Sequence, residues 1–230
     1  MLVHTVPPLV EAFAGWCAEL LPGVRLLHIL DEPLLERIRR RGSWESEDED
    51  RLAGHVALAE ALGADAVLVT CSTVSLGVDV IRPRFSIPVV TIDHEMAREA
   101  VQAGTRIALV ATAATTIEPS TGLLLAAGRA AGRTVLVTSR LVDGALPALL
   151  TGDRATHDRL LEAAIRDAAA DNEVVVLAQA TMTSVLAAMG DRPVPVPVLA
   201  SPLLALREVG RIFEARDSAL PTPARDEVTP

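Results

Sequence analysis

Cys71 and the two hydroxyl residues that follow it, Ser72 and Thr73, form the group in this sequence that is best suited to chemistry. The apolar run at residues 66–69 is typical of a buried strand, which would deliver the thiol to its C-terminal end. In open α/β sheets, ligands bind at this edge. Ser72 or Thr73 would cap the next helix, whose positive end favours a thiolate. The alternative is a buried structural cysteine, since free cysteines are often buried.

A second segment, residues 173–182, repeats this pattern of strand, polar turn and helix. When the two segments are aligned, Gln179 falls opposite Cys71, and Thr181 falls opposite Thr73. Each segment then continues into a short strand marked by proline. A duplicated unit predicts two similar lobes whose loops face one cleft, although a match of this length between aliphatic segments can also arise by chance.

A run of hydroxyl residues follows a third predicted strand, residues 106–111. Thr112, Thr115 and Thr116 lie where a strand ends and a helix begins. Side-chain and backbone donors at such a position can bind a carboxylate. The alternative is ordinary capping of the helix by Thr115 or Thr116.

Strands alternate with helices along the whole chain, which is typical of parallel α/β layers. We therefore expect an α/β fold with two pseudo-symmetric lobes, each a mostly parallel sheet flanked by helices. The predicted organisation is a first lobe of residues 1–103 and 191–214 that carries Cys71, a second lobe of residues 104–190 that carries Thr112 and Gln179, and a flexible tail of residues 215–230.

The composition excludes several classes of function. The chain has 230 residues and a net charge of −9, so nucleic acid is not an expected partner. It contains no lysine, which excludes a lysine Schiff base to pyridoxal phosphate, and no tyrosine to act as an acid or base. Neither GxGxxG nor a GxxxxGK[ST] phosphate loop is present.

No apolar run reaches the roughly 20 residues of a membrane-spanning helix, and a basic signal-peptide region is missing. We therefore expect no membrane association, and a cytoplasmic protein whose two cysteines, Cys17 and Cys71, are reduced thiols. Cys17 lies on the apolar face of a predicted helix and is interpreted as a core residue.

The order and spacing of these motifs resemble the aspartate/glutamate/hydantoin racemase superfamily, which includes arylmalonate decarboxylases and maleate cis–trans isomerases. The resemblance runs from His4 to about Phe213. It implies two lobes with the active site in the cleft between them, and chemistry that needs no cofactor. In the racemases of this superfamily, one cysteine thiolate removes the α-proton and a second cysteine delivers a proton to the opposite face.

The sequence departs from this pattern at two positions. The second cysteine is replaced by Gln179, or by Ala180 if the alignment shifts by one, and an amide cannot exchange a proton near neutral pH. His4 stands where the superfamily has Asp or Asn. It could act as an acid–base partner of Cys71, or it could be hydrogen bonded in the first turn. Weaker candidates for the cleft are His28, Asp93, His94 and Glu95.

The resemblance therefore implies an enzyme, a racemase or isomerase of a small carboxylate or amino-acid derivative. The alternatives are a single-cysteine decarboxylase and a non-catalytic carboxylate-binding protein. A metal-dependent hydrolase finds no support in the spacing of histidine and acidic residues, and homo-oligomerisation stays open. The expected catalytic residues are Cys71 and His4, and the expected substrate-binding residues are Thr5, Ser72, Thr73, Thr112, Thr115, Thr116, Gln179, Ala180 and Thr181.

Overall fold

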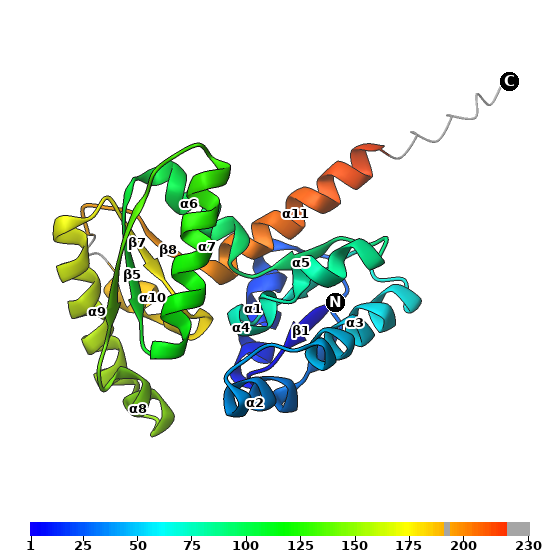
Figure 1. Ribbon diagram of the computed structural model, residues 1–230, viewed down its shortest axis with the longest axis horizontal. Coiled ribbons are helices and arrows are strands. Elements are labelled where there is room, and N and C mark those ends of the chain that lie inside the picture. The colour runs from blue at the N-terminus through cyan, green and yellow to red at the C-terminus, as the bar shows by residue number, and fades with distance from the viewer. Residues whose placement is uncertain (191–193, 220–230) are drawn as a thin grey trace, which may run out of the picture.

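A computed structural model describes residues 1–190 and 194–219, which form two parallel sheets of four strands each (Figure 1). The first sheet has the order β2-β1-β3-β4 and the second has the order β6-β5-β7-β8, so the two sheets share one topology. The predicted α/β class and the two lobes are confirmed. The strands are β1 (Leu2–His4), β2 (His28–Leu30), β3 (Val67–Val69), β4 (Val89–Thr91), β5 (Arg106–Ala111), β6 (Leu136–Leu141), β7 (Val174–Leu177) and β8 (Val198–Ala200).

Helices connect consecutive strands, as parallel pairing requires. The first half of the chain contains α1 (Pro8–Leu20), α2 (Glu32–Arg41), α3 (Ser46–Ala61), α4 (Ser72–Ser75), α5 (Val78–Ile81), the 3-10 turn Arg82–Arg84 and α6 (His94–Ala103). The second half contains the 3-10 turns Ala114–Thr116 and Ala180–Thr183, and the helices α7 (Ile117–Ala130), α8 (Ala145–Leu150), α9 (Arg154–Asp171), α10 (Ser184–Met189) and α11 (Ser201–Ala219).

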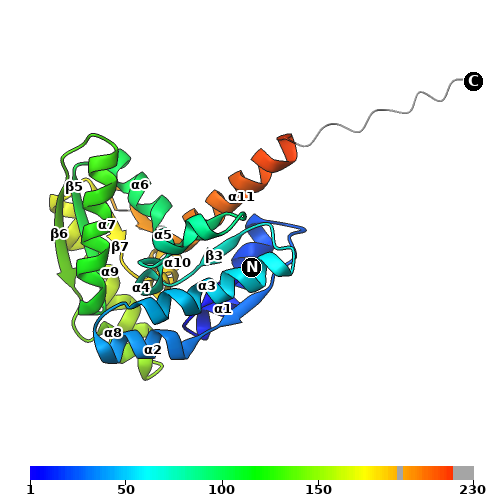
Figure 2. The same cartoon turned by 45° about the vertical axis from the view of Figure 1, so that its right-hand side comes forward.

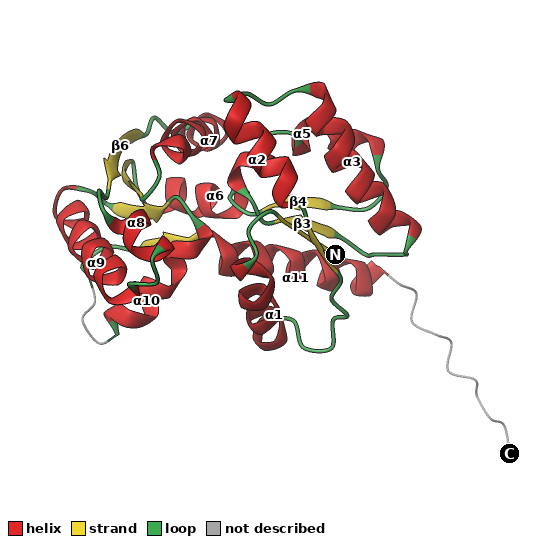
Figure 3. Ribbon diagram, turned by 90° about the horizontal axis from the view of Figure 1, so that it is seen from below, coloured by secondary structure: helices red, strands yellow, loops and turns green. Residues whose placement is uncertain are grey.

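Both sheets are covered on their two faces, because alternate side chains of a strand point to opposite sides. In the first sheet, Val67 and Val69 pack with α2, α3 and α5, whereas Leu68 packs with α1 and α11 (Figure 3). The second sheet is covered by α9 and α10 on one face and by α6 and α7 on the other. The carboxyl ends of the strands are therefore the edges where polar loops gather.

The loop between α2 and α3 is fixed at both ends and reaches the turn after α4. Gly42 ends α2 in the left-handed conformation, at φ 78°, and Glu45 and Asp48 form a capping box at the start of α3. Trp44 of this loop occupies the space that a side chain at Gly77 would need. A glycine between α4 and α5 thus lets the loop pack directly against the segment that follows Cys71.

Two helices cross from one lobe to the other. α6 follows β4 of the first sheet, but its Met96 and Ala100 pack with Leu109 in the core of the second sheet. α11 follows β8 of the second sheet and returns to the first lobe, where Leu206 packs in one cluster with Phe13 (Figures 1 and 2). Each lobe is therefore covered in part by a helix that follows a strand of the other lobe, α6 on the second sheet and α11 on the first.

The expected lobe boundaries are wrong at both crossovers. α6 lies within residues 1–103 but covers the second sheet. β8 lies within residues 191–214 but pairs with β7, with Val198 next to Val175. Amphipathic periodicity shows that a helix has a buried face, but it does not show which sheet buries that face.

The end of the chain also differs from the expectation. α11 continues to Ala219, beyond the predicted start of the tail at residue 215. The rest of the predicted tail, residues 220–230, lies outside the described residues. Within the described ranges, none of the helices has the length and apolar character needed to cross a membrane.

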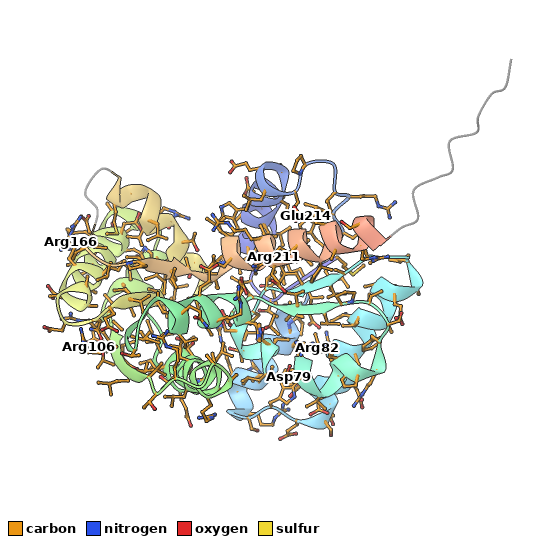
Figure 4. The ribbon with its side chains drawn as sticks, turned by 90° about the horizontal axis from the view of Figure 1, so that it is seen from above. Asp79, Arg82, Arg106, Arg166, Arg211 and Glu214 are labelled. Atoms are coloured by element: carbon orange, nitrogen blue, oxygen red, sulfur yellow. The ribbon has the colours of Figure 1, made fainter. Side chains whose placement is uncertain are left out.

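A buried carboxylate joins the two crossover helices. Glu95 of α6 is 2% exposed and accepts hydrogen bonds from Arg98 Nε and Nη2, at 2.7 and 2.6 Å. Arg211 of α11, which is labelled in Figure 4, also hydrogen bonds to Glu95. The hydrogen bonds from Arg98 and Arg211, together with their charges, lower the pKa of Glu95 from 4.5 to about 2 despite burial.

We expect Glu95→Gln to destabilise the fold by about 2 kcal/mol at pH 7, because two guanidinium groups lose their anion at a buried contact. The folded pKa lies below the unfolded value, so this contribution is complete above pH 4.5 and is lost as the pH falls towards 2. Urea unfolding at pH 7 and pH 3 measures it, and the difference between wild type and variant should narrow at pH 3.

Glu36→Gln is the matched control. Glu36 forms an exposed ion pair with Arg40 on one helix, so its loss should change the free energy of unfolding by less than about 0.5 kcal/mol. Equal effects of the two substitutions at pH 7 would contradict the role assigned to Glu95.

Candidate active site

The hydrogen bonds between the central strands relate the two lobes residue by residue. In the first lobe, Thr70 N donates to Val3 O at 3.0 Å. In the second lobe, Ala178 N donates to Val110 O at 2.9 Å. Because these bonds join the same strands of the repeated topology, the residue after each donor and the second residue after each acceptor occupy equivalent positions.

Cys71 and Gln179 are therefore equivalent, as the sequence alignment predicted. Each residue comes just after a central strand and immediately before a helical turn, and each has an extended backbone conformation. Thr5 and Thr112 form the second equivalent pair, at the ends of β1 and β5. Both pairs lie at the carboxyl edges of their sheets.

Cys71 is a half-buried free thiol. Its carbonyl oxygen accepts hydrogen bonds from the backbone N and the Oγ of Ser75, at 2.9 and 3.0 Å. These bonds hold the single turn of α4 on the end of β3. Ser72 and Thr73, both half-buried, begin that turn, so their backbone N–H groups have no acceptor within it.

His4 lies at the same edge, but its ring is engaged elsewhere. The side chain is fully buried, with Nδ1 2.8 Å from Thr70 Oγ1 and Nε2 3.0 Å from His28 Nδ1. The Thr70 hydroxyl donates to Val3 O, so His4 Nδ1 is the donor to Thr70, and Nε2 of a neutral His4 accepts from His28. Among the described residues, no hydrogen bond joins His4 to Cys71.

Burial, followed by repulsion from His28, lowers the pKa of His4 from 6.5 to about 4. The ring is therefore neutral at pH 7, stacked on His28 at a centroid distance of 5.2 Å. Burial also lowers the pKa of His28. This arrangement fits the hydrogen-bonded alternative for His4, and a direct acid–base partnership with Cys71 stays a prediction.

The second lobe brings Thr112 and Gln179 together. Gln179 Oε1 accepts hydrogen bonds from Thr112 N and Thr112 Oγ1, at 2.8 and 3.0 Å. This pair of donors fixes the orientation of the carboxamide, because only its oxygen can accept them. The Gln179 NH2 group makes no hydrogen bond with any described residue, so its two protons can serve a ligand.

The hydroxyl of Thr5 differs from that of Thr112 in its hydrogen bonding. The two hydroxyls are equivalent, but Thr5 Oγ1 is buried and lacks a partner in the described part of the chain. A buried hydroxyl without a partner is uncommon and marks a place where a ligand can accept a hydrogen bond.

The remaining predicted binding residues lie in two turns, Thr115 and Thr116 before α7, and Ala180 and Thr181 after Gln179. Thr116 stands at the N-cap position of α7, but its side chain makes no capping hydrogen bond and Oγ1 instead donates to Ala113 O at 2.8 Å, and Thr115 is exposed. Thr181 is half-buried in the 3-10 turn after Gln179. Ala180 packs against the core of the first lobe, so the turn that carries it touches both lobes.

A cavity of about 140 Å³ adjoins Cys71 through Ser72. It lies between α4, α6 and α7. The sequence did not predict Ser75 and Ser120 as lining residues, because a serine within a helix gives no periodic signal. Its polar lining includes Ser72, Ser75, Asp79, Asp93, His94 and Ser120.

Asp93 is the buried acid of this cavity. It is 5% exposed, and burial raises its pKa from 3.8 to about 6 even though the hydroxyls of Ser72 and Ser201 favour the carboxylate. The sequence indicated Asp93 and Glu95 from their place after β4. The structure separates them, since Asp93 lines the cavity and Glu95 joins α6 to α11.

A metal centre is not formed by these groups. Within residues 1–190 and 194–219, no three His, Cys, Asp or Glu side chains converge on a position that could hold an ion. His28 contacts His4, and Asp31 instead pairs with Arg51 and His55.

Comparison with known families decides the classification. The sequence matches the family described as Asp/Glu/Hydantoin racemase over residues 8–209. The chain belongs to this family. The superfamily resemblance given by the motifs is thereby confirmed.

Solved structures of two racemases and of a decarboxylase mutant share the fold. Glutamate racemase from Francisella tularensis subsp. tularensis SCHU S4, in complex with D-glutamate, superposes with a TM-score of 0.68 at 13% identity, over 97% of this chain and 83% of that chain. Allantoin racemase from Klebsiella pneumoniae gives 0.67 at 19% identity, over 94% and 87%. A glycine-to-cysteine mutant of arylmalonate decarboxylase gives 0.51 at 17% identity, over 74% and 76%.

A search of curated proteins gives no match. The structural similarities, all at low identity, show that this chain has the racemase-family fold. The substrate and the roles of individual residues have to be argued from the site itself.

We expect this racemase-family fold to lose stability between pH 7 and pH 5 through His4. The folded pKa of about 4 lies below the unfolded value of 6.5, so the unfolded state binds more protons in this interval. The loss should be about 1–2 kcal/mol. Urea unfolding of wild type and His4→Gln at pH 7, 6 and 5 measures it. The variant should show a flatter dependence, and equal slopes would assign the effect to another group.

Proposed function

We propose that this protein is a cofactor-independent enzyme that exchanges the proton on the carbon next to a carboxylate, in a small acid or amino-acid derivative, with Cys71 as its acid and base. The observation that carries the proposal is a half-buried free thiol at the carboxyl end of a central strand. A thiolate there can accept the α-proton, and the resulting thiol can return a proton to the carbanion. A reducing compartment such as the cytoplasm suits this free thiol.

Hydrogen-bond donors at the carboxyl ends of the central strands suit a carboxylate. The hydroxyl of Thr5 is buried without a partner in the described residues, and the first amides of α4, from Ser72 and Thr73, need acceptors. In the other lobe, Thr112 fixes the oxygen of the Gln179 carboxamide, and the NH2 group has no partner among the described residues. Such preorganised donors stabilise the negative charge that moves onto a carboxylate when its α-proton leaves.

Gln179 sets the limit of this chemistry. An amide holds its protons at neutral pH, so Gln179 can orient an oxygen of the substrate but cannot replace a second thiol. A mechanism with two thiols on opposite faces is therefore not available at these positions. Proton transfer by this chain is expected from the Cys71 face.

A second candidate function follows from the same observation. A malonate that loses carbon dioxide leaves an enediolate, which the donors above can hold, and the Cys71 thiol can protonate its carbon from one side. Water then restores the thiol. One thiol suffices for this decarboxylation, and the product would have a single configuration.

The test is proton exchange at the α-carbon in D2O, followed by NMR. The panel contains both enantiomers of aspartate and glutamate, allantoin and phenylmalonate. Cys71→Ser should slow exchange or decarboxylation by at least about 1000-fold, because a serine hydroxyl is a far weaker base than a thiolate. Exchange with retention supports proton transfer from the Cys71 face alone, exchange with inversion would require a second proton donor on the opposite face, and release of carbon dioxide from phenylmalonate supports the decarboxylase.

Cys17→Ala provides the matched control. Cys17 is 2% exposed within the core, where burial raises its thiol pKa, so its removal should leave the rate unchanged. Full activity of the Cys71→Ser variant would refute the mechanism. Binding of a carboxylate without exchange would identify a carboxylate-binding protein on an enzyme fold.

A further inference from the structure

Asp93 is a buried carboxylate whose hydrogen bonding within the described residues is incomplete. It stands at the N-cap position of α6, but its side chain makes no capping hydrogen bond. Asp93 Oδ1 is buried and has no partner among the described residues. Burying a carboxylate without a full set of partners costs free energy, so a carboxylate kept at this position points to a ligand.

The cavity that Asp93 lines has the character of a cation site. Asp79 and His94 also line it, with the hydroxyls of Ser72, Ser75 and Ser120, and no arginine is among the described residues that line it, although Arg82 pairs with Asp79 at its rim. Carboxylate and hydroxyl oxygens accept hydrogen bonds from ammonium groups, whereas a second carboxylate would be repelled. The volume of about 140 Å³ would hold about four water molecules, which is enough for an amino group and the adjoining carbon.

We propose that this cavity receives the protonated nitrogen of the substrate and that Asp93 is its counter-ion. Ser72 connects the cavity to the thiol, since it lines the cavity and directly follows Cys71. The proposal rests on the proposed function and narrows it. The substrate then carries an ammonium group, and Asp93 selects it over dicarboxylates and malonates that lack one.

Asp79 supplies the control within the same cavity. Its side chain is 83% exposed and forms an ion pair with Arg82 at 2.6 Å (Figure 4). The charge of Asp79 is thus already compensated and solvated. A general electrostatic effect on the cavity would appear in both Asp79→Asn and Asp93→Asn, whereas a counter-ion role would appear only in the second variant.

Protection of Cys71 from iodoacetamide at pH 7.5 provides the measurement. The probes are two matched pairs, glutamate with glutarate and aspartate with succinate, with both enantiomers of each amino acid. Alkylation is followed by peptide mass spectrometry. Trypsin cleaves this lysine-free chain only after arginine and not before Pro83, so Cys71 lies in peptide 52–84 and Cys17 in peptide 1–25.

In the wild type, glutamate or aspartate should protect Cys71 at a concentration at least about tenfold below that needed with glutarate or succinate, respectively. The reason is that the ammonium group gains a charge-assisted hydrogen bond. Asp93→Asn should remove this difference and leave protection by glutarate or succinate unchanged. Asp79→Asn should keep the difference. The melting temperature of Asp93→Asn at pH 8 should equal or exceed that of the wild type, since a buried charge is removed.

The outcomes separate the two proposals. Equal protection by amino acids and deaminated acids in the wild type overturns the role of Asp93 and leaves the carboxylate site at Cys71 standing. A preference that survives in Asp93→Asn, or a lower melting temperature of that variant, assigns Asp93 a structural role instead. Absence of protection by every probe contradicts the proposed function, and the inference falls with it.

Discussion

The packing of α6 against α11, through Leu204 and the ion pair of Glu95 with Arg211, is the contact on which the arrangement of the two lobes depends. α6 and α11 are the only described helices that each leave one sheet and cover the other, and the carboxylate of Glu95 on α6 joins them through Arg211 of α11, while Arg98 pairs with it from α6 itself. The strand ends that carry Cys71 and Gln179 belong to different sheets. Their relative position is therefore set by how these two helices pack, and the exchange of helices makes each lobe part of the other's core.

The two halves of the molecule use one scaffold for different purposes. The strand order and register are the same, yet in the second lobe Thr112 donates to the carboxamide oxygen of Gln179 and fixes this side chain. Among the described residues, the equivalent groups of the first lobe, the thiol of Cys71 and the hydroxyl of Thr5, share no such hydrogen bond. A fold that fixes the side chain in one lobe and leaves the thiol of the other lobe available is suited to proton transfer from one side, with Gln179 orienting the ligand.

His4 and Asp93 are both buried polar side chains at this site, but they differ in how completely they are hydrogen bonded. His4 is the most buried of the predicted site residues, and its two ring nitrogens are hydrogen bonded to Thr70 and His28. Asp93 is nearly as buried, but Oδ1 has no partner within the described ranges. Since native folds satisfy most of their buried polar groups, the unsatisfied Asp93 carries more information about a ligand than the satisfied His4.

The sequence by itself determined the local features of this protein. Runs of aliphatic residues at 66–69 and 174–177, each followed by polar residues, were enough to predict parallel strands and the equivalence of Cys71 and Gln179, and the resemblance of these motifs and the threonine run to the racemase superfamily implied the two-lobed fold. Only the tertiary structure decided that α6 covers the second sheet and that β8 pairs with β7 within it. The tertiary structure also decided that His4 hydrogen bonds to His28 and that Asp93 and Ser72 line the same cavity. Periodicity and strand ends are local properties of the chain. The choice of a packing partner depends on contacts between distant residues, which a single sequence does not record.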